Sequence, residues 1–522
     1  MPLRSPSATI LRAMLPRRRD ALPLLVGLGL VLLHALRFVD VEHAVDDAWI
    51  SFRVARNLLE HGVLTYAPSR APVEGATNLT WTLLSTTWIA ALPGVDPILP
   101  ARIAGLACHL LAVGIGICTA ARVVDRAGGD GAKASLAAAI ALGAPGSLTY
   151  WAMSGLETGL WGLLLAAGVA LLISRRHLLA GLCLATLAAT RPEGVLAGGL
   201  LCLGALAFQG RAALSTAVVF GAGVAALEGF RLVVYGDWVP NTFHAKEPSV
   251  EAGLDYVLGA LGPSGIGLLG LPAGLAAARR RPAAALLLLA CVLVAGAAGS
   301  GGDWMPGYRR LTLPLLLMGG LAGVGVGLAA GRPQRLLAWG GIVGAAACAL
   351  LAGASRLDHG RFPHGVHAVL GERALETPGV QGIAAVDIGR LGWAFPGEVV
   401  DLVGLTDAHL ARLPGSHADK PWDEQWFRGH DPDLLIVRSE TPVVDPLPGP
   451  LVLGRPEQGM VRSVLDNGGY HLHTVLHPAD GQWLLIFVKD GLALDLALWG
   501  PRAPKDLRQL LIEARLGAGG SP

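Results

Sequence analysis

The feature that most constrains this chain is a series of apolar runs, most of them about 15 to 23 residues long. Such runs suit helices that cross a bilayer, because lipid offers no hydrogen-bond partner to an open backbone. Of the 522 residues, 52% are hydrophobic and only 15% are charged, which indicates a polytopic α-helical membrane protein. The runs lie at about 22 to 39, 79 to 92, 99 to 121, 134 to 150, 159 to 174, 178 to 190, 194 to 208, 212 to 235, 263 to 278, 283 to 299, 311 to 330 and 335 to 353.

The basic residues between the runs predict the topology. Arg17 to Arg19 precede the first run, so we expect an uncleaved first helix with a cytoplasmic N-terminus. The run at 79 to 92 is short and ends at Pro-Gly, which favours an interfacial or re-entrant helix. If it does not cross, the positive-inside rule predicts about 11 spans, with the polar motifs and the C-terminus outside. Counting it as a span would instead put Arg279 to Arg281 outside.

The apolar runs stop at about Ser355, which predicts two domains. We expect residues 1–354 to form the transmembrane domain, which carries the candidate catalytic residues, with external loops at 40–78 and 236–262. Residues 355–522 form a C-terminal soluble α/β or α+β domain outside the membrane. Its candidate strands are Ile383 to Asp387, Val399 to Val403, Leu434 to Val437, His471 to Leu476 and Trp483 to Val488.

Charge and cysteine content exclude several classes of function. The net charge is only +2, so no nucleic-acid-binding surface is expected. All six cysteines lie in apolar runs, which indicates neither a disulfide framework nor a metal site. The chain has no Walker A or other nucleotide-binding signature.

The first motif with chemical potential is VDDAWISFRVARNLLEHG, which contains Asp46, Asp47 and Arg53. Two adjacent carboxylates outside the membrane suit a general base or a divalent cation, since like charges raise one pKa. The alternative is a helix N-cap with solvated arginines. This segment alone does not separate the two interpretations.

Three acidic or basic motifs follow it. Glu74 and Asn78 flank a glycine turn in VEGATN, where a turn with a helix cap is the simpler interpretation. Glu157 in SGLET and Arg191 in TRPEG adjoin apolar segments, where ionised groups usually face a polar cavity or a partner. The alternative for TRPEG is an internal ion pair between Arg191 and Glu193.

The external loop at 236–262 carries PNTFHAK, with Asn241, His244 and Lys246. Amide, imidazole and ammonium groups this close could hold a phosphate and sugar hydroxyls. Solvated side chains are the alternative.

A last motif, GGDWMPGYRR, places Asp303, Arg309 and Arg310 between two spans. Paired arginines outside run against the positive-inside tendency, and an anionic ligand such as a phosphate would explain them. The alternative is an ion pair with Asp303 or with the soluble domain.

Seven strings in this order carry a family resemblance: DDAWISFRVARNLLEHG, VEGATN, SGLET, RPEG, PNTFHAK, GGDWMPGYRR and DIGRLGW...VVDLVGLTDAHLAR. From about Asp46 to His430 the chain resembles the terminal (β-1,2) arabinofuranosyltransferases of mycobacterial cell-wall arabinan and their bacterial relatives, of the GT-C class. The resemblance implies a polyprenyl-phosphate sugar donor, used on the outer face, and an active site at the acidic pair.

More distantly, the layout is similar to protein O-mannosyltransferases and lipid A aminoarabinose transferases, in which an acidic residue on this loop is essential. The resemblance matches Asp46 and Asp47 to the two acidic positions. We favour Asp46 as the base that activates the acceptor, with Asp47 second, and Glu157 as a wall of the same pocket. Ala76 and Trp49 depart from the family pattern and leave the transferred sugar open.

The sequence therefore predicts a bacterial plasma-membrane glycosyltransferase. It would move a sugar, such as arabinofuranose, from polyprenyl phosphate to a cell-envelope glycan, lipid or protein. A divalent cation is compatible with the sequence but not required by it. The alternative is a transporter or flippase of a lipid-linked saccharide. Arg53, Arg191, Asn241, His244, Lys246, Arg309 and Arg310 are expected to bind the donor, and Glu74, Asn78, Glu157 and Asp303 to line the pocket.

Overall fold

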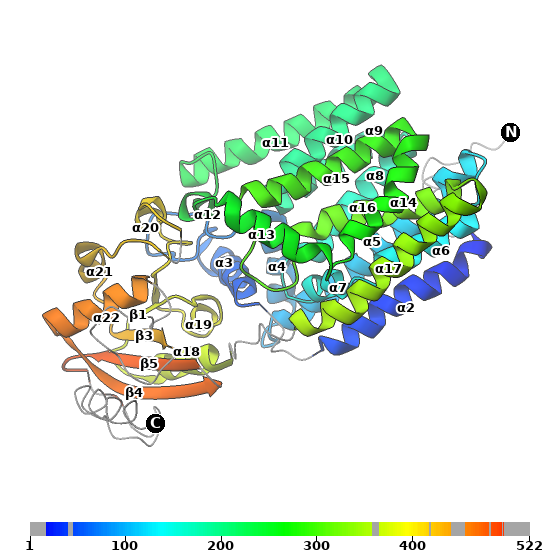
Figure 1. Ribbon diagram of the computed structural model, residues 1–522. Coiled ribbons are helices and arrows are strands. Elements are labelled where there is room, and N and C mark those ends of the chain that lie inside the picture. The colour runs from blue at the N-terminus through cyan, green and yellow to red at the C-terminus, as the bar shows by residue number, and fades with distance from the viewer. Residues whose placement is uncertain are drawn as a thin grey trace, which may run out of the picture.

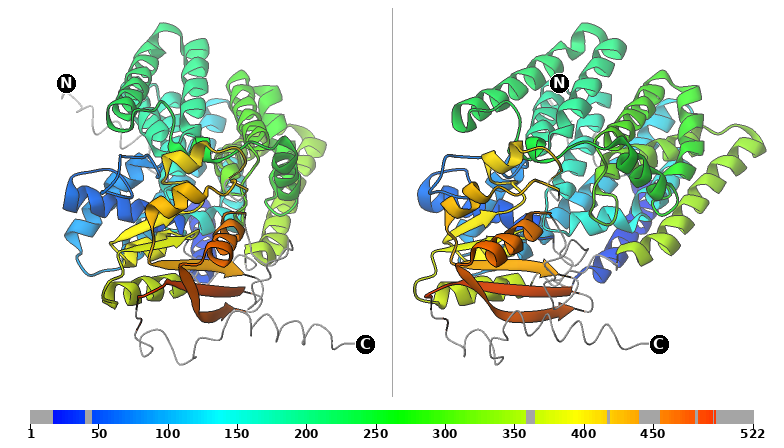
Figure 2. Two further views of the ribbon diagram at one scale, coloured as in Figure 1. Left: turned by 90° about the vertical axis from the view of Figure 1, so that its left-hand side faces the viewer. Right: turned by 60° about the vertical axis from the view of Figure 1, so that its left-hand side comes forward.

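The computed structural model describes residues 17–39, 45–357, 365–416, 419–439, 455–479, 482–492 and 494. A bundle of helices carries a mixed α/β unit at one end (Figure 1). Two further views in Figure 2 show the strands grouped at that same end. The helical bundle and the C-terminal sheet agree with the fold predicted from the sequence.

Every apolar run forms a helix, and the run at 134 to 150 forms two because Pro145 has no amide hydrogen to continue the first. The helices of the bundle are α2 (Ala21–Arg37), α4 (Leu79–Ala91), α5 (Ile98–Arg126), α6 (Gly131–Gly143), α7 (Gly146–Ala152), α8 (Thr158–Ile173), α9 (His177–Thr190), α10 (Glu193–Gln209), α11 (Leu214–Tyr235), α14 (Ile266–Arg279), α15 (Arg281–Gly299), α16 (Thr312–Leu328) and α17 (Gly331–Leu357). The two loops predicted to be external add α3 (Asp47–His61), α12 (Asn241–Ala245) and α13 (Val250–Leu261).

Six helical segments of the described chain are long and apolar enough to cross a membrane. The number is seven if α13 and α14, which meet at 80°, form one broken span. One of the six, Glu193–Tyr235, comprises both α10 and α11, and three further apolar helices, α6, α8 and α9, are shorter. The count of about 11 spans therefore stays a prediction. With 13 residues, α4 is short for a span, in agreement with the interfacial interpretation.

Helix α16 is the centre of the bundle. Of its apolar window, 89% is buried inside the protein, whereas the other spans are mostly open to their surroundings. It begins at Thr312, one residue after the paired arginines of GGDWMPGYRR. The most firmly packed helix therefore has Arg309 and Arg310 at its N-terminal end.

The C-terminal unit is a five-stranded mixed sheet in the order β2-β1-β3-β5-β4. Strand β1 is parallel to β2 and β3, whereas β5 is antiparallel to β3 and β4. All five predicted strands are present, and the boundary at 354/355 stays a prediction. The elements are β1 (Gly382–Ala385), β2 (Glu398–Asp401), β3 (Leu434–Ser439), β4 (Tyr470–Ala479), β5 (Gln482–Lys489), α18 (Gly365–Glu376), α19 (Gly389–Ala394), α20 (Ala408–Arg412), α21 (Glu424–His430) and α22 (Arg455–Asn467).

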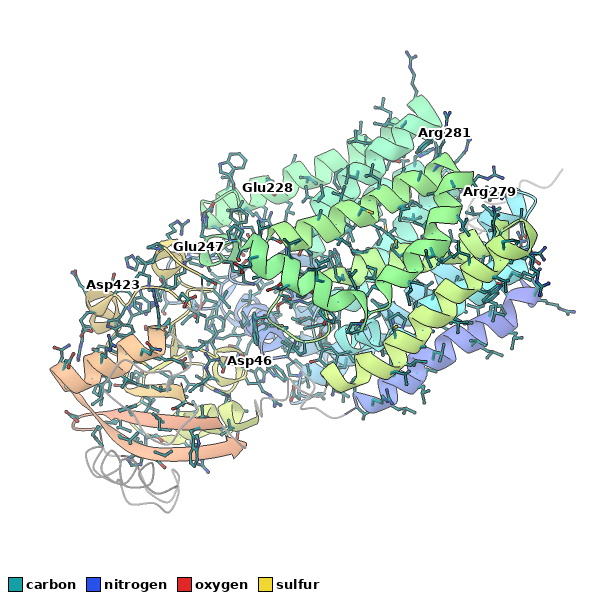
Figure 3. All side chains as sticks on the ribbon, viewed as in Figure 1. Asp46, Glu228, Glu247, Arg279, Arg281 and Asp423 are labelled. Carbon is teal, nitrogen blue, oxygen red and sulfur yellow. The ribbon has the colours of Figure 1, made fainter. Side chains whose placement is uncertain are left out.

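Helix α3 belongs to both parts of the molecule. Ile50, Val54 and Tyr66 share one hydrophobic cluster with β1, β3 and α19 of the C-terminal unit. Trp49 and Phe52, on another face of α3, pack in a cluster with residues of α4, α5 and α7. The acidic pair at the start of α3 therefore lies at the junction of bundle and sheet, where Figure 3 labels Asp46.

Candidate active site

Asp46 joins α3 to the C-terminal unit. Its two carboxylate oxygens accept hydrogen bonds from the backbone amides of Gly389, at 2.7 Å, and Arg390, at 2.8 Å. These amides begin α19, so the carboxylate caps that short helix and makes no capping bond to its own. Both oxygens of Asp46, which we favoured as the base, are thus engaged by the fold.

Arg53 extends the same junction. Its buried guanidinium donates to the carbonyl oxygens of Tyr66, Gly392, Phe395 and Gly397. Arg53 was predicted to bind the donor, but the structure places it in the interface between α3 and the segment around α19. Carbonyl oxygens of Tyr66 and of the segment around α19 satisfy this buried charge. Arg53 therefore holds α3 against that segment.

Asp47 projects to a different place. Its carboxylate makes no hydrogen bond or ion pair with any residue that the structure describes, although it is partly buried. Burial raises the pKa of Asp47 above its ordinary value, and the positive charges of Arg309 and Lys246 oppose that rise. A carboxylate of raised pKa beside two cations can accept a proton from a hydroxyl group.

The cations beside Asp47 come from two segments, the loop that follows α11 and the loop that precedes α16. Arg309 donates to Asp303 through Nε, at 2.9 Å, and lies over the ring of Trp151 at 5.1 Å. Lys246, directly after α12, has no hydrogen-bond or ion-pair partner within the described ranges. Burial disfavours ionisation of Asp303, but Arg309 and Lys246 outweigh it and lower the pKa of that carboxyl. We call Asp47, Lys246, Asp303, Arg309 and Arg310 the polar cluster.

A chain of charged groups borders the polar cluster. Asn78 donates to Glu157 at 2.7 Å, and Glu157 accepts from Arg191 at 2.6 Å. Arg191 also pairs with Glu193 at 3.1 Å, and Glu193 approaches Arg310 at 3.5 Å. The internal Arg191–Glu193 ion pair considered as an alternative is therefore present. Because two carboxylates share its guanidinium, Arg191 is better placed to orient Glu157 and Glu193 than to hold a phosphate.

Three other predicted site residues point elsewhere. Asn241 donates its side-chain amide to carbonyl oxygens of the segment that joins β2 to α20. His244 pairs with Asp237 at 2.9 Å, and Glu74 forms a buried ion pair with Arg231 at 2.9 Å. The Asn241 side chain joins the loop after α11 to the C-terminal unit, and Glu74 joins the loop before α4 to α11.

Three residues that contact the predicted site residues were not identified from the sequence. Trp151 and Trp161 lie beneath the guanidinium groups of Arg309 and Arg191, a stacking that spacing along the chain does not reveal. Arg231 could have been found, because an arginine inside an apolar run demands an acidic partner. That partner is Glu74, 157 residues earlier in the chain.

Within the described ranges, no three His, Cys, Asp or Glu side chains come together in a way that could hold a metal ion. The positively charged residues of the polar cluster are Lys246, Arg309 and Arg310, which can bind a phosphate.

Comparison with known proteins supports the fold. A family profile described as "Domain of unknown function (DUF8728)" matches residues 359–487, the C-terminal unit. No curated protein matches the chain. Among solved structures, ArnT from Cupriavidus metallidurans in the apo state is 16% identical, with a TM-score of 0.54 over 92% of this chain and 99% of that one.

The same protein bound to undecaprenyl phosphate is 14% identical, with a TM-score of 0.54 over 95% of this chain and all of that one. A third structure, the apo oligosaccharyltransferase of Archaeoglobus fulgidus, has a TM-score of 0.47 at 10% identity and covers 80% of this chain and 69% of its own, too little similarity to support inference. At these identities the likeness establishes the fold alone. The chain has an ArnT-like GT-C membrane fold, as the sequence predicted.

Proposed function

We propose that the protein is a membrane glycosyltransferase that moves a sugar from a polyprenyl phosphate to an acceptor hydroxyl. The observation that carries this proposal is the carboxylate of Asp47, which lies beside Lys246 and Arg309 on an ArnT-like fold and has no hydrogen-bond or ion-pair partner among the described residues. A solved ArnT structure holds undecaprenyl phosphate, the group that such a reaction releases. We place the protein in a bacterial plasma membrane, with the N-terminus inside and the polar cluster and C-terminal unit outside.

The proposed step needs a base on one side of the sugar and positive charge on the other. Asp47 takes the proton of the acceptor hydroxyl as its oxygen bonds to the anomeric carbon. The bond from that carbon to the phosphate oxygen breaks, and the electron pair leaves with the polyprenyl phosphate. Lys246, Arg309 and Arg310 stabilise the negative charge that develops on the phosphate.

Asp47, and not Asp46 as favoured from the sequence, acts as the base in this proposal. Asp46 acts as a positioning residue, because its carboxylate fixes the start of α3 against α19. Asp47, the next residue, faces the cations and receives the proton. Glu157 and Asn78 act through Arg191, which orients Glu193 and Arg310 along the border of the site.

The transferred sugar is proposed from the family resemblance alone. Arabinofuranose from polyprenyl-phosphoryl-arabinose is the first choice, and a hexose the second. The acceptor is a glycan, lipid or protein of the cell envelope. A transporter of lipid-linked saccharides is less consistent with the structure, because the ion pairs of the described residues lie toward the two ends of the bundle and not at its middle.

The test compares Asp47→Asn, Asp46→Asn and Asp255→Asn in membranes given polyprenyl-phosphoryl-arabinose or polyprenyl-phosphoryl-hexose. Asp255 is an exposed acid on α13 and serves as the control. We expect Asp47→Asn to reduce transfer by about 10²- to 10⁴-fold without loss of thermal stability. Asp46→Asn should lower stability, and the control should resemble wild type. Full transfer by Asp47→Asn would show that Asp47 is not the catalytic base. Movement of the donor across the bilayer without sugar transfer would favour the transporter.

A further inference from the structure

The half of the bundle away from the polar cluster contains a large cavity. A cavity of about 500 Å³ opens there between α5, α8, α10, α15 and α16. Its walls are almost entirely aliphatic: they run along α10 from Leu200 to Phe208 and along α16 from Leu316 to Val324. This volume is within the range of sites that bind small molecules or parts of lipids.

The rim of this cavity is basic. Arg126, Arg175 and Arg280 line it, together with Gln209, and no acidic residue does. These arginines lie at the helix ends far from Asp46, where Figure 3 labels Arg279 and Arg281, the neighbours of Arg280 in the chain.

The arginines of the rim retain binding capacity. Arg280 donates one bond, to the carbonyl oxygen of Ala127 at 3.2 Å. Arg175 is exposed, and its side chain has no hydrogen-bond or ion-pair partner among the residues described. The acids closest along the chain are already paired, Asp125 with Arg17 and Asp130 with Lys133. The rim therefore carries uncompensated positive charge.

We propose that this cavity binds a phospholipid with an anionic head group, taken from the leaflet on the opposite side of the membrane from the polar cluster. The aliphatic walls accept the acyl chains, and the three arginines hold the phosphate. Basic pockets between membrane-spanning helices bind anionic head groups in this way. The inference goes beyond the proposed transfer reaction and does not depend on it.

Two glycines allow the cavity to be filled without strain. Gly204 on α10 and Gly320 on α16 both line it, and a Cβ at either position would meet no atom within 4 Å. The double variant Gly204→Leu/Gly320→Leu should occupy the volume and keep both helices intact. Gly340→Leu is the matched control, because Gly340 also has open space around its Cβ but does not line the cavity.

For the test, full-length protein is incubated with an equimolar mixture of phosphatidylglycerol and phosphatidylethanolamine, and the lipids retained are counted by native mass spectrometry. We expect wild type and Gly340→Leu to retain phosphatidylglycerol over phosphatidylethanolamine by on the order of tenfold or more. The Arg126→Ala/Arg175→Ala/Arg280→Ala variant should lose this preference, and the cavity-filled variant should lose the retained lipid. Arg175→Ala alone, which breaks no hydrogen bond or ion pair with a described residue, should weaken the preference, whereas Arg281→Ala should not.

Three outcomes would overturn the proposal. Wild type could retain both lipids equally, or the cavity-filled variant could retain phosphatidylglycerol like wild type. In the third, added undecaprenyl phosphate would displace phosphatidylglycerol from wild type. The cavity would then bind the polyprenyl chain of the donor. Because lipid retention is measured and not transfer, failure here would leave the proposed transferase reaction standing.

Discussion

Asp46 and Asp47 are neighbours in the chain but belong to two regions of different character. In the interface around α19, backbone groups satisfy each charge: amides bind Asp46, and carbonyl oxygens bind Arg53. In the polar cluster, Asp47 and Lys246 have no direct partner within the described ranges, and their charges act through space. Groups that hold the fold have used their bonding capacity, whereas groups suited to a ligand retain it.

The helix itself explains why the pair divides in this way. Successive residues of an α-helix point about 100° apart, so two adjacent carboxylates cannot face the same partner. One of the pair meets the C-terminal unit and the other meets the loops that carry Lys246 and Arg309. An acidic pair thus supplies one anchoring and one reactive carboxylate.

Removal of one cation from the polar cluster should have the largest effect. It tests whether the polar cluster serves sugar transfer and not the stability of the fold. Lys246→Met should reduce transfer by about 10- to 100-fold, because the leaving phosphate loses one source of positive charge. Thermal stability should change little beyond the pH-dependent term of Asp47, since the lysine makes no hydrogen bond or ion pair with any described residue. Initial rates and thermal melts of the purified protein measure the two effects.

Lys489→Met is the matched control, because that lysine pairs with Asp431 in the C-terminal unit. It should leave transfer unchanged. Wild-type transfer by Lys246→Met would remove the lysine from the proposed site.

The interface around α19 should respond in the opposite manner, with a loss of stability. A Cβ at Gly389 would lie 2.0 Å from the backbone oxygen of Asp46, so Gly389→Ala must push α19 away from α3. We expect a cost of about 1–3 kcal/mol in the free energy of unfolding. Limited proteolysis and thermal melts should detect it.

Gly429→Ala on α21 is the control, since no atom lies within 4 Å of a Cβ there. If Gly389→Ala proved as stable as that control, α3 and α19 would not be packed as described.

Much of the fold was predictable from the sequence because it depends on local periodicity. The apolar runs of the bundle became helices such as α5 and α16, and alternating or continuous apolar segments became all five strands. Pro145 divided one run into two helices, and α13 lay in a loop for which no helix was predicted. The order of the strands could not be predicted, because sheet order depends on contacts between residues far apart in the chain.

The residues of the polar cluster could be singled out from the sequence, but their contacts could not, and their roles stay a proposal. Arg309, Lys246 and Asp303 were identified from charge placement, and the structure brings them together. Composition could not show that Asp46 meets amides 343 and 344 residues away. The same limit applies to Arg53, whose partners near α19 are equally distant in the chain.

In the loop at 236–262, Asn241 and His244 should also differ in how much they contribute to stability. Asn241 donates to carbonyl oxygens of residues 404, 405 and 407, whereas His244 makes one partly exposed pair with Asp237. Asn241→Ala should cost about 1–2 kcal/mol of stability because buried carbonyl oxygens lose their donor. His244→Ala should cost less than about 1 kcal/mol. Equal costs in denaturant titrations would mean that the loop does not rest on Asn241.

The smallest expected effect concerns pH. As a base, Asp47 must be ionised, so transfer should fall as the pH drops through its folded-state pKa. Burial raises that pKa above 3.8, and the acid limb of the rate profile should therefore lie above the usual aspartate range. Lys246 opposes the rise, so Lys246→Met should move the limb to higher pH.

The same shift has a consequence for stability with a definite sign. Between 3.8 and the raised pKa, the folded protein binds a proton that the unfolded chain has lost, so the free energy of unfolding falls as pH rises through this window. Asp47→Asn should abolish this slope, and Lys246→Met should extend it to higher pH. Lys133→Met, on α6, should change neither the slope nor the acid limb, because Lys133 pairs with Asp130 at the other end of the bundle. An acid limb that stays in place in Lys246→Met would show that the lysine and Asp47 do not share one site.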